Sequence, residues 1–359
     1  MSKVFNIVFL CFISFSALYS SEYKALLLSP ELSPGRILAI NDHEQALIIT
    51  KDSKPFLYDK KTGLAFIETN CLHAHLYTLN NAGQILGLGY GPSDESKPFI
   101  WSKDVGVQWL DIFGSKYIST TDLNDLGQII GSYTPVGEKP ELVRPFTWKN
   151  GIATDMGPGS EFSKSIENLG YHVMEISLVS INNKGELAGY FSYGKFNAKT
   201  QKYILVGYES FYWNGNVHIL PFKIRSLAMK VNNCGSVMVV SADYSHFLTN
   251  TYLWNLKNGV KIIENFEGKV LNDSNLILGT KPQHSSYLLW KDEKISTFEK
   301  LLGVENINHL APRFSDTYEI EGLSEFLDMN NKGQIICRGL IWGDLYPCLL
   351  EPIDSSNCQ

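Results

Sequence analysis

The side chains of this chain that could do hydrolytic chemistry are carboxylates in segments that we expect to be loops. Two carboxyl groups facing each other across a cleft can cleave a glycosidic bond. Seven acidic residues lie in such segments: Asp94, Glu95, Glu138, Glu141, Asp243, Asp316 and Glu319. Their spacing selects no pair, so solvated loop carboxylates are the simpler interpretation.

Other catalytic and metal-binding patterns are missing from the sequence. It contains no Gly-x-Ser-x-Gly elbow, no His-Glu-x-x-His helix and no phosphate-binding loop. The segment Asn124 to Gln128 resembles a calcium loop only superficially, because it lacks alternating ligands and a closing Glu. The 8 His are scattered, and the cysteines are too far apart for a zinc site. We therefore expect no catalytic residue, no metal and no cofactor, and we predict that the protein is not an enzyme.

Two cysteines form a candidate disulfide. After Cys11, an odd number remains (Cys71, Cys234, Cys337, Cys348 and Cys358), so at least one has no disulfide partner within the chain. We expect Cys337 and Cys348 on neighbouring antiparallel strands, where a bridge could form if its demanding geometry is met. The sequence leaves this pairing open.

Aromatic residues in the loop-rich segments indicate recognition rather than catalysis. Exposed aromatic rings with polar neighbours suit the binding of sugars or proteins. The candidate ligand-binding residues are Tyr90, Tyr133, Tyr193, Phe196, Tyr203 and Tyr244. The alternative is that these rings pack the loops against each other.

The elements that must position these residues follow from one repeated phrase. An apolar residue is followed by Asn, then by Asn or Asp, usually by Gly three positions after the first Asn, and then by two apolar residues. The first Asn of each copy is Asn41, Asn80, Asn124, Asn182, Asn232, Asn272 or Asn330. Successive copies are 39, 44, 58, 50, 40 and 58 residues apart by subtraction. A repeat of this length fixes the architecture before any local argument.

Each copy predicts four short antiparallel strands. The turn glycines should have positive φ, as a tight hairpin requires: Gly83, Gly127, Gly185, Gly235 and Gly333. Glu44 and Asn275 take this place in the other two copies. A second phrase ends in an aromatic residue such as Trp101 or Trp148, followed by a short turn and another apolar run. Four strands in roughly 40–50 residues is the period of a β-propeller blade, and stacked blades would bury these aromatics.

Loop length separates two faces of the predicted fold. Insertions lie between Met156 and Leu178 and between Leu301 and Phe326, each between the last strand of one copy and the first of the next. A third, from Tyr193 to Gly207, lies between the second and third strands of its copy. All three fall on the face opposite the Asn-Gly turns, and varied loops are where repeat proteins concentrate function.

The two ends of the chain predict how the fold closes. The seventh copy ends without a fourth apolar run, whereas Tyr23 to Leu28 precedes the first copy and belongs to none. Unpaired strand edges would favour aggregation. We therefore predict an all-β, seven-bladed β-propeller of four-stranded antiparallel blades. Residues 21–359 should form it as a single domain, with Tyr23 to Leu28 pairing with Tyr346 to Leu350 in the last blade.

The repeats resemble the HAF repeats of exported bacterial proteins. LNNAGQILG with PFIW, LNDLGQIIG with PFTW, and INNKGELAG with SFYW match the family's Asn-Asp-x-Gly phrase, aliphatic pair and Phe-x-Trp phrase. The His-Ala before that Phe in the family is replaced here by Pro55, Pro98, Pro145 or Ser210 beside the Phe. The resemblance implies export and a propeller-like fold, and it supplies no catalytic residues.

The first 20 residues differ from the repeats. Lys3 precedes an apolar run from Val4 to Ala17, which is typical of a secretory signal peptide and short for a membrane span. We expect an exported protein in the periplasm, at the cell surface or secreted. The formal net charge of −6 argues against a nucleic-acid or acidic-membrane partner.

Two functions of different classes fit these observations. We favour a non-enzymatic binding protein that uses the long-loop face to hold a glycan or protein ligand outside the cell. The alternative is a propeller enzyme acting on an extracellular polysaccharide or a related substrate.

Overall fold

The computed structural model describes residues 22–28, 35–71, 73–90, 96–139, 142–222, 226–243, 248–282, 286–304, 322–341 and 344–353. These residues form seven four-stranded sheets of antiparallel strands and two short helices, α1 (Glu161–Glu167) and α2 (Phe298–Leu302). The fold is therefore all-β and of the seven-bladed β-propeller class, as the repeats predicted. The signal-peptide segment, Asp94, Glu95, Glu141, Tyr244, Asp316 and Glu319 lie outside the described residues.

The chain divides into two compact units, which are described separately. Unit 2 contains residues 68–286, and unit 1 contains residues 1–67 and 287–359. The strands of unit 2 are β6 (His73–Leu79), β7 (Ile85–Tyr90), β8 (Ser96–Ser102), β9 (Gly106–Trp109), β10 (Ile118–Leu123), β11 (Ile129–Tyr133), β12 (Arg144–Lys149), β13 (Ile152–Asp155), β14 (His172–Ile181), β15 (Leu187–Asn197), β16 (Lys202–Trp213), β17 (Val217–Ile219), β18 (Ser226–Val231), β19 (Ser236–Asp243), β20 (Leu248–Asn255), β21 (Gly259–Ile263), β22 (Glu267–Leu271) and β23 (Ile277–Thr280). The prediction that residues 21–359 form a single domain stays a prediction.

The strands of unit 1 are β1 (Tyr23–Leu27), β2 (Gly35–Ile40), β3 (Gln45–Thr50), β4 (Pro55–Asp59), β5 (Gly63–Phe66), β24 (Tyr287–Lys291), β25 (Lys294–Thr297), β26 (Gly322–Met329), β27 (Ile335–Ile341) and β28 (Asp344–Pro352). Six of the seven sheets follow chain order, for example β2-β3-β4-β5 and β14-β15-β16-β17. The seventh has the order β1-β28-β27-β26, so the N-terminal strand completes the last sheet.

The turn between the first two strands of each sheet has the backbone that the repeat requires. Gly83, Gly127, Gly185, Gly235 and Gly333 have φ of 72°, 71°, 77°, 72° and 74°. In the two copies without Gly, Glu44 and Asn275 have φ of 62° and 61°, so the turn conformation is kept there at a steric cost. Positive φ at this position is therefore set by the hairpin rather than by the residue.

The first Asn of each copy is buried and connects neighbouring sheets. Asn124, which is 4% exposed, accepts hydrogen bonds at Oδ1 from the backbone N–H groups of Leu126 and Gln128 at 3.0 and 2.9 Å. Its Nδ2 donates to Gln128 Oε1 at 2.7 Å and to the backbone carbonyl of Asn182 in the next sheet at 2.8 Å. One side chain thus closes its own turn and binds the following one.

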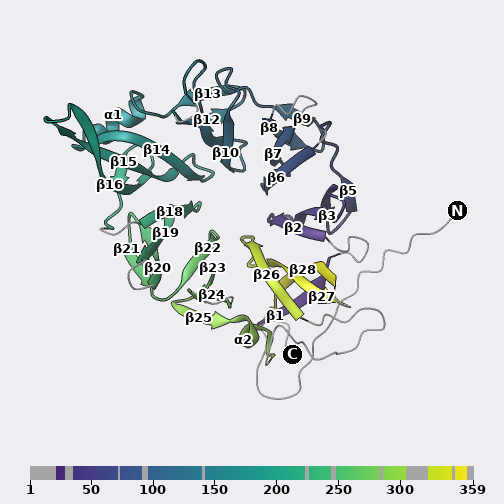
Figure 1. Cartoon of the computed structure of the whole chain (residues 1–359). Coiled ribbons are helices and arrows are strands. Elements are labelled where there is room, and N and C mark those ends of the chain that lie inside the picture. Colours follow the sequence, from purple (N-terminus) through teal and green to yellow (C-terminus); the bar gives the residue numbers. More distant parts are fainter. Residues whose placement is uncertain are drawn as a thin grey trace. The chain divides into compact units, whose positions relative to one another are not determined.

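This inter-sheet bond recurs within each unit. In unit 2, side-chain amides donate to backbone carbonyls in four successive steps of 2.8–2.9 Å: Asn80 to Asn124, Asn124 to Asn182, Asn182 to Asn232, and Asn232 to Asn272. In unit 1, Asn330 donates to the carbonyl of Asn41 at 3.0 Å. We call the four residues Asn80, Asn124, Asn182 and Asn232 the amide row. The amide row joins the turns between the first and second strands of the sheets of unit 2, so these turns lie at the same end of the sheets. Because the strands are antiparallel, the longer connections of unit 2 lie at the opposite end. β10, β14 and β18 lie next to one another in the same unit (Figure 1).

Aliphatic and aromatic side chains fill the space between sheets of the same unit. One core cluster joins Leu86 and Ile100 of one sheet to Ile129 and Phe146 of the next, with Trp148 packed against it. Another joins Tyr212 of β16 to Trp254 of β20. These aromatics of the second phrase therefore contribute to inter-sheet packing.

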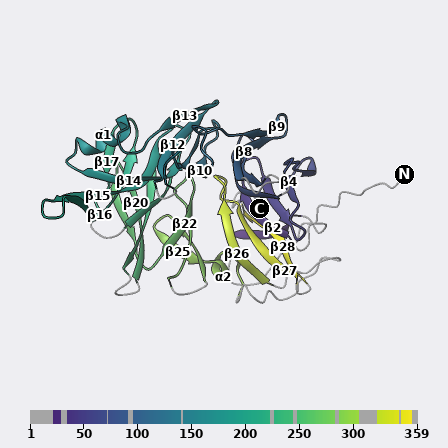
Figure 2. The ribbon, with the colours of Figure 1, turned by 45° about the horizontal axis from the view of Figure 1, so that its top comes forward.

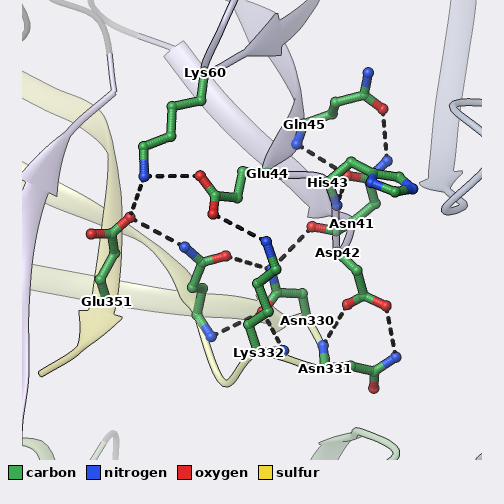
Figure 3. Close-up of polar contacts among 11 residues, drawn as sticks. Asn41, Asp42, His43, Glu44, Gln45, Lys60, Asn330, Asn331, Lys332 and Glu351 are labelled. Atoms are coloured by element: carbon green, nitrogen blue, oxygen red, sulfur yellow. Dashed lines mark hydrogen bonds and ion pairs between the residues drawn. The ribbon is translucent and has the colours of Figure 1, made fainter. Parts of the chain in front are cut away.

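The predicted closure is confirmed within unit 1. Strand β1 pairs with β28 in antiparallel register, with Tyr23 opposite Pro352 and Leu27 opposite Cys348. Glu351 stands where the other copies have an aromatic residue, and it is 8% exposed. It forms an ion pair with Lys24 at 3.0 Å. It also forms one with Lys60 at 3.0 Å, and Lys60 contacts Glu44 at 2.8 Å (Figure 3). Charged groups thus replace aromatic packing where β1 joins the last sheet.

The candidate disulfide residues occupy the expected register. Cys337 of β27 lies directly opposite Cys348 of β28, and both are fully buried. Both are thiols in the structure, and burial raises the pKa of Cys337 well above its usual value. The strand pairing agrees with the sequence prediction, whereas the bridge itself stays a prediction.

The three predicted insertions have different outcomes. The first contains α1, whose N-terminus is capped by the Ser160 hydroxyl accepting from the Ser163 N–H at 3.1 Å. The second lies mostly outside the described residues. The third is not a loop, because β15 and β16 continue as a paired hairpin to Asn197 and Lys202. Among the described residues, no helix is long and apolar enough to cross a membrane.

Candidate ligand-binding site

The predicted ligand-binding residues differ in how much of each ring is accessible. Tyr133, at the end of β11, is 6% exposed, and its ring centroid lies 4.7 Å from Phe113 and 6.3 Å from Phe146. Tyr90, at the end of β7, is half-buried and lies edge-on to His75 at 5.5 Å. Tyr133 therefore belongs to the core of the structure rather than to a ligand surface, because Phe146 of its own sheet and Phe113 of the connection before that sheet cover it.

Tyr193 belongs to a group of aromatic rings where β14 begins. Its ring centroid lies 5.0 Å from that of Tyr171 at an interplanar angle of 78°, and Tyr171 lies 5.1 Å from Phe191. Both tyrosines are half-buried and pack against a core cluster that includes Phe162 of α1. One side of each ring therefore packs against α1 and the paired strands, and the other side remains accessible to solvent.

Glu209 adds a carboxyl group to this group of rings. It lies on β16 directly opposite Phe191 and two residues from Gly207, which pairs with Tyr193. Opposite and alternate residues of paired strands share a face, so Glu209 and Tyr193 are on the same side of the sheet. Burial raises the pKa of Glu209, and it raises that of Tyr171, to which the charge of Glu209 also contributes. We call Tyr171, Tyr193 and Glu209 the tyrosine cluster.

The preceding sheet has a charged residue at the position that corresponds to Glu209, and that residue has hydrogen-bonding partners. Arg144 lies four residues before Trp148, as Glu209 lies four before Trp213. Arg144 is bound by Asp155, with Nε 3.1 Å from Oδ1, and it also donates to the carbonyl of Pro158 at 2.8 Å. Among the described residues, no side chain or backbone group forms a hydrogen bond or ion pair with the Glu209 carboxylate. Its hydrogen-bonding capacity is thus available to a ligand.

Phe196 and Tyr203 lie farther out on the same hairpin, beyond a β-bulge at Tyr193 and Gly194. They are directly opposite each other, 47% and 46% exposed, with ring centroids 5.4 Å apart. His172 stacks on Tyr203 with a centroid distance of 3.5 Å. The structure therefore brings three of the predicted residues, Tyr193, Phe196 and Tyr203, onto one hairpin, but at two separate places along it.

Two members of the tyrosine cluster were not predicted from the sequence. Tyr171 lies in the first insertion, where no repeat pattern assigns a direction to a side chain. Glu209 had a usable signal, since it alternates along an apolar strand with Phe211, which is buried, and with Trp213, which is half-buried. A carboxylate at an inward strand position is uncommon, so the alternation of Glu209 with Phe211 and Trp213 is the sequence signal that could have identified it.

A compact group in the described part of the chain combines an Asp, a Ser and a Lys, residue types that enzymes use. Asp122, Ser180 and Lys230 come from three neighbouring sheets, and Asp122 Oδ2 lies 2.9 Å from both Ser180 Oγ and Lys230 Nζ. The Ser180 side chain is fully buried, and its Oγ also accepts from the backbone N–H of Val231 at 3.2 Å. A substrate could not reach this hydroxyl, so the group links sheets rather than providing a nucleophile. No set of three His, Cys, Asp or Glu residues with metal-binding geometry occurs among the residues described.

Comparison with known proteins supports the β-propeller fold but identifies no family and no function. No protein-family model matches the chain, and no curated protein sequence matches it. The HAF resemblance therefore remains a resemblance. Among solved structures, the chain is similar to the β-propeller domain of the Trilobed protease from Pyrococcus furiosus, with a TM-score of 0.50 and 9% identity over 86% of this chain and 90% of that one.

Other similar structures are more weakly related in shape. A streptogramin B lyase structure has a TM-score of 0.47 and 11% identity over 92% of this chain and 97% of that one. YCF48 bound to D1 peptide has a TM-score of 0.47 and 9% identity over 95% of this chain and 100% of that one. At these identities the likeness concerns the β-propeller fold alone.

Proposed function

We propose that this chain is an exported, non-enzymatic binding protein that holds a glycan at the tyrosine cluster of unit 2. The observation that carries the proposal is the half-buried Glu209 carboxylate, which has no partner among the described residues and lies beside two tyrosine rings at nearly right angles. Sugar rings present apolar C–H faces that pack on aromatic rings and hydroxyl groups that donate to carboxylates. The cluster offers both kinds of contact within one sheet.

Protein recognition by the same face is the other form of the binding hypothesis. It draws on the exposed aromatic rings, which are frequent anchors in protein interfaces. The tyrosine cluster fits a sugar better, because its rings are recessed and its carboxylate is unpaired. An enzyme acting on polysaccharide is favoured by one specific observation, the raised pKa of Glu209, since a general acid needs such a shift.

A glycan array with matched variants tests the proposal. Glu209→Gln and Tyr193→Ser should each lower the signal for the bound glycan by tenfold or more, on the order of one buried charge-assisted hydrogen bond or one stacking contact. Tyr117→Ser is the control, because Tyr117 is 64% exposed in a connection of the same unit. Glycan binding unaffected by both cluster variants would refute the site.

The same glycan then separates binding from catalysis. The wild-type chain is incubated with the ligand that the array identifies, and the mixture is analysed for shortened oligosaccharides. A binding protein returns the glycan intact. Cleavage that Glu209→Gln abolishes would replace the binding function with the hydrolase alternative.

A further inference from the structure

The outer part of the β15–β16 hairpin has a composition unlike the rest of the chain. Residues 194–208 contain Lys195, Lys199 and Lys202 and no Asp or Glu, although the whole chain carries a net charge of −6. Five apolar side chains in this segment are between 46% and 56% exposed: Phe196, Tyr203, Ile204, Leu205 and Val206. We call residues 195–206 the hairpin tip. It projects beyond the other strands of its unit (Figure 2).

The strand register sorts these side chains onto two faces. Beyond the bulge, Phe196 pairs with Tyr203, Gly194 with Leu205, and Lys195 with Ile204. Because opposite residues share a face and neighbours alternate, Phe196, Tyr203 and Leu205 lie on one face of the tip. Asn197 pairs with Lys202, so Lys195, Ile204 and Lys202 lie on the other face. The tip is therefore amphipathic, with one aromatic and aliphatic face and one largely basic face.

The side chains of the aromatic face are ordered by contacts with one another. His172 of β14 stacks on Tyr203, and the Phe196 ring meets Tyr203 edge-on. The three rings thus order one another, although Phe196 and Tyr203 remain almost half exposed. An exposed apolar surface that is already ordered loses little conformational entropy when it is covered.

We propose that the hairpin tip inserts its aromatic face into the interface of a lipid surface that carries anionic headgroups. Tyrosine is favoured at the boundary between headgroups and acyl chains, where a ring can be buried while its hydroxyl stays hydrated. Lysines on the opposite face can extend their charged ends to the phosphates while their stems cover apolar surface. This site is separate from the tyrosine cluster and goes beyond glycan binding.

The positive charge of the hairpin tip determines its attraction to an anionic membrane, although the net charge of the whole chain is negative. Exposed charges farther apart than about 10 Å are largely screened at moderate salt. A membrane that touches the tip therefore experiences its three lysines more strongly than distant acidic residues. A second copy of the chain is less suitable as the occupant, because two identical tips would bring their lysines together.

Vesicle co-sedimentation of the full chain tests the proposal. The wild type should bind phosphatidylcholine vesicles containing phosphatidylglycerol more tightly than vesicles of phosphatidylcholine alone, and added salt should reduce the difference. Each lysine near an anionic surface contributes about fivefold in partitioning, so K195Q, K199Q and K202Q together should weaken binding by about a hundredfold. The apolar variant Tyr203→Ser with Leu205→Ser should weaken binding to both vesicle types.

Matched controls keep the outcome clear. Lys149→Gln with Ile152→Ser changes a lysine and an apolar residue that is 70% exposed in the β12–β13 turn, and it should bind as the wild type does. The lysine variant tests the proposal even if the apolar variant folds poorly. Binding that the hairpin variants leave unchanged would overturn it, as would a wild type that does not sediment with either vesicle. Self-association without lipid, lost in Leu205→Ser, would assign the face to a second copy instead.

Discussion

Replacing Asn124 tests whether the amide row holds neighbouring sheets of unit 2 together. Asn124→Ala removes four hydrogen bonds of 2.7–3.0 Å, two accepted by Oδ1 and two donated by Nδ2. Each bond contributes about 1 kcal/mol net, and buried partners left unsatisfied add to the loss. We expect the free energy of unfolding to fall by about 4 kcal/mol, a large share of the roughly 5–15 kcal/mol typical of a folded domain.

The isosteric variant Asn124→Asp separates the two roles of the side chain. The introduced carboxylate can still accept from Leu126 and Gln128, so the turn stays capped. It loses the donor to the Asn182 carbonyl and to Gln128 Oε1, and it places negative charge beside both oxygens. Because the site is buried, the pKa of the introduced group should be raised. At neutral pH this variant should be at least as destabilised as Asn124→Ala, and it should recover partly in acid as the carboxyl becomes a donor.

Urea unfolding followed by tryptophan fluorescence and by circular dichroism measures both variants. Asn214→Ala is the control, because Asn214 is exposed and accepts only longer bonds, such as that from the Asn216 N–H at 3.3 Å. It should cost less than 1 kcal/mol. If Asn124→Ala were no less stable than Asn214→Ala, the amide row would have no role in stability. If Asn124→Asp kept wild-type stability, the inter-sheet bond would be unimportant and only the turn cap would matter.

Three further predictions concern the turns and the closure. Gly127→Val should lower the free energy of unfolding by a few kcal/mol in urea titrations, because φ is 71° at this position and the added Cβ would lie 3.3 Å from Gln84 Oε1. Gly127→Asn should lower it much less, because Asn tolerates positive φ better than Val does. Glu351→Gln should cost about 1–2 kcal/mol at neutral pH, because its two ion pairs involve half-exposed lysines. Burial alone would raise the pKa of Glu351, but hydrogen bonds from Lys60 and Lys24 offset this and hold it below the usual 4.5. That stabilisation is complete above pH 4.5 and is lost as pH falls through the lower pKa of the folded state, so the difference between wild type and variant, measured by urea unfolding across pH, should disappear in acid. Deleting residues 22–28 should lower the melting temperature and cause association detectable by light scattering, because β28 would lose its partner strand; a shortened chain that stays monomeric and equally stable would contradict the closure.

The fold could be predicted because the repeat encodes local geometry seven times. Turn glycines, apolar pairs and aromatic strand ends each specify a hairpin by steric preference and burial alone. The sequence shows that the first Asn recurs in every copy, but it does not show what its side chain binds. Asn124 is not among the residues with positive φ, because the turn gives that conformation to Gly127. The amide of Asn is needed because it accepts within its own turn and donates to the next, and that second bond exists only after the sheets have packed.

The site was harder to predict because its residues depend on contacts between elements that no repeat describes. We expected Tyr133 to be exposed at a strand end, but Phe113, from the connection that precedes its own sheet, covers it. The segment from Tyr193 to Gly207 looked like a loop, because its composition of Gly, Lys and Asn resembles one. Paired backbone hydrogen bonds and alternate side chains make it a hairpin instead. Sequence composition therefore located the variable segment but did not determine its structure.

The fourth copy of the repeat departs from the others in ways that serve no evident structural purpose. Its second and third strands are 11 and 12 residues long, whereas β11 and β12 of the preceding sheet have 5 and 6. It carries Glu209, which has no partner among the described residues, where its neighbour carries Arg144 bound by Asp155. Longer strands expose apolar surface, and partial burial of a carboxylate without a partner costs free energy, so both features reduce stability in isolation. Folding alone does not account for these two features, and this contrast with the preceding copy is the physical reason why both proposed binding surfaces include residues of β15 and β16.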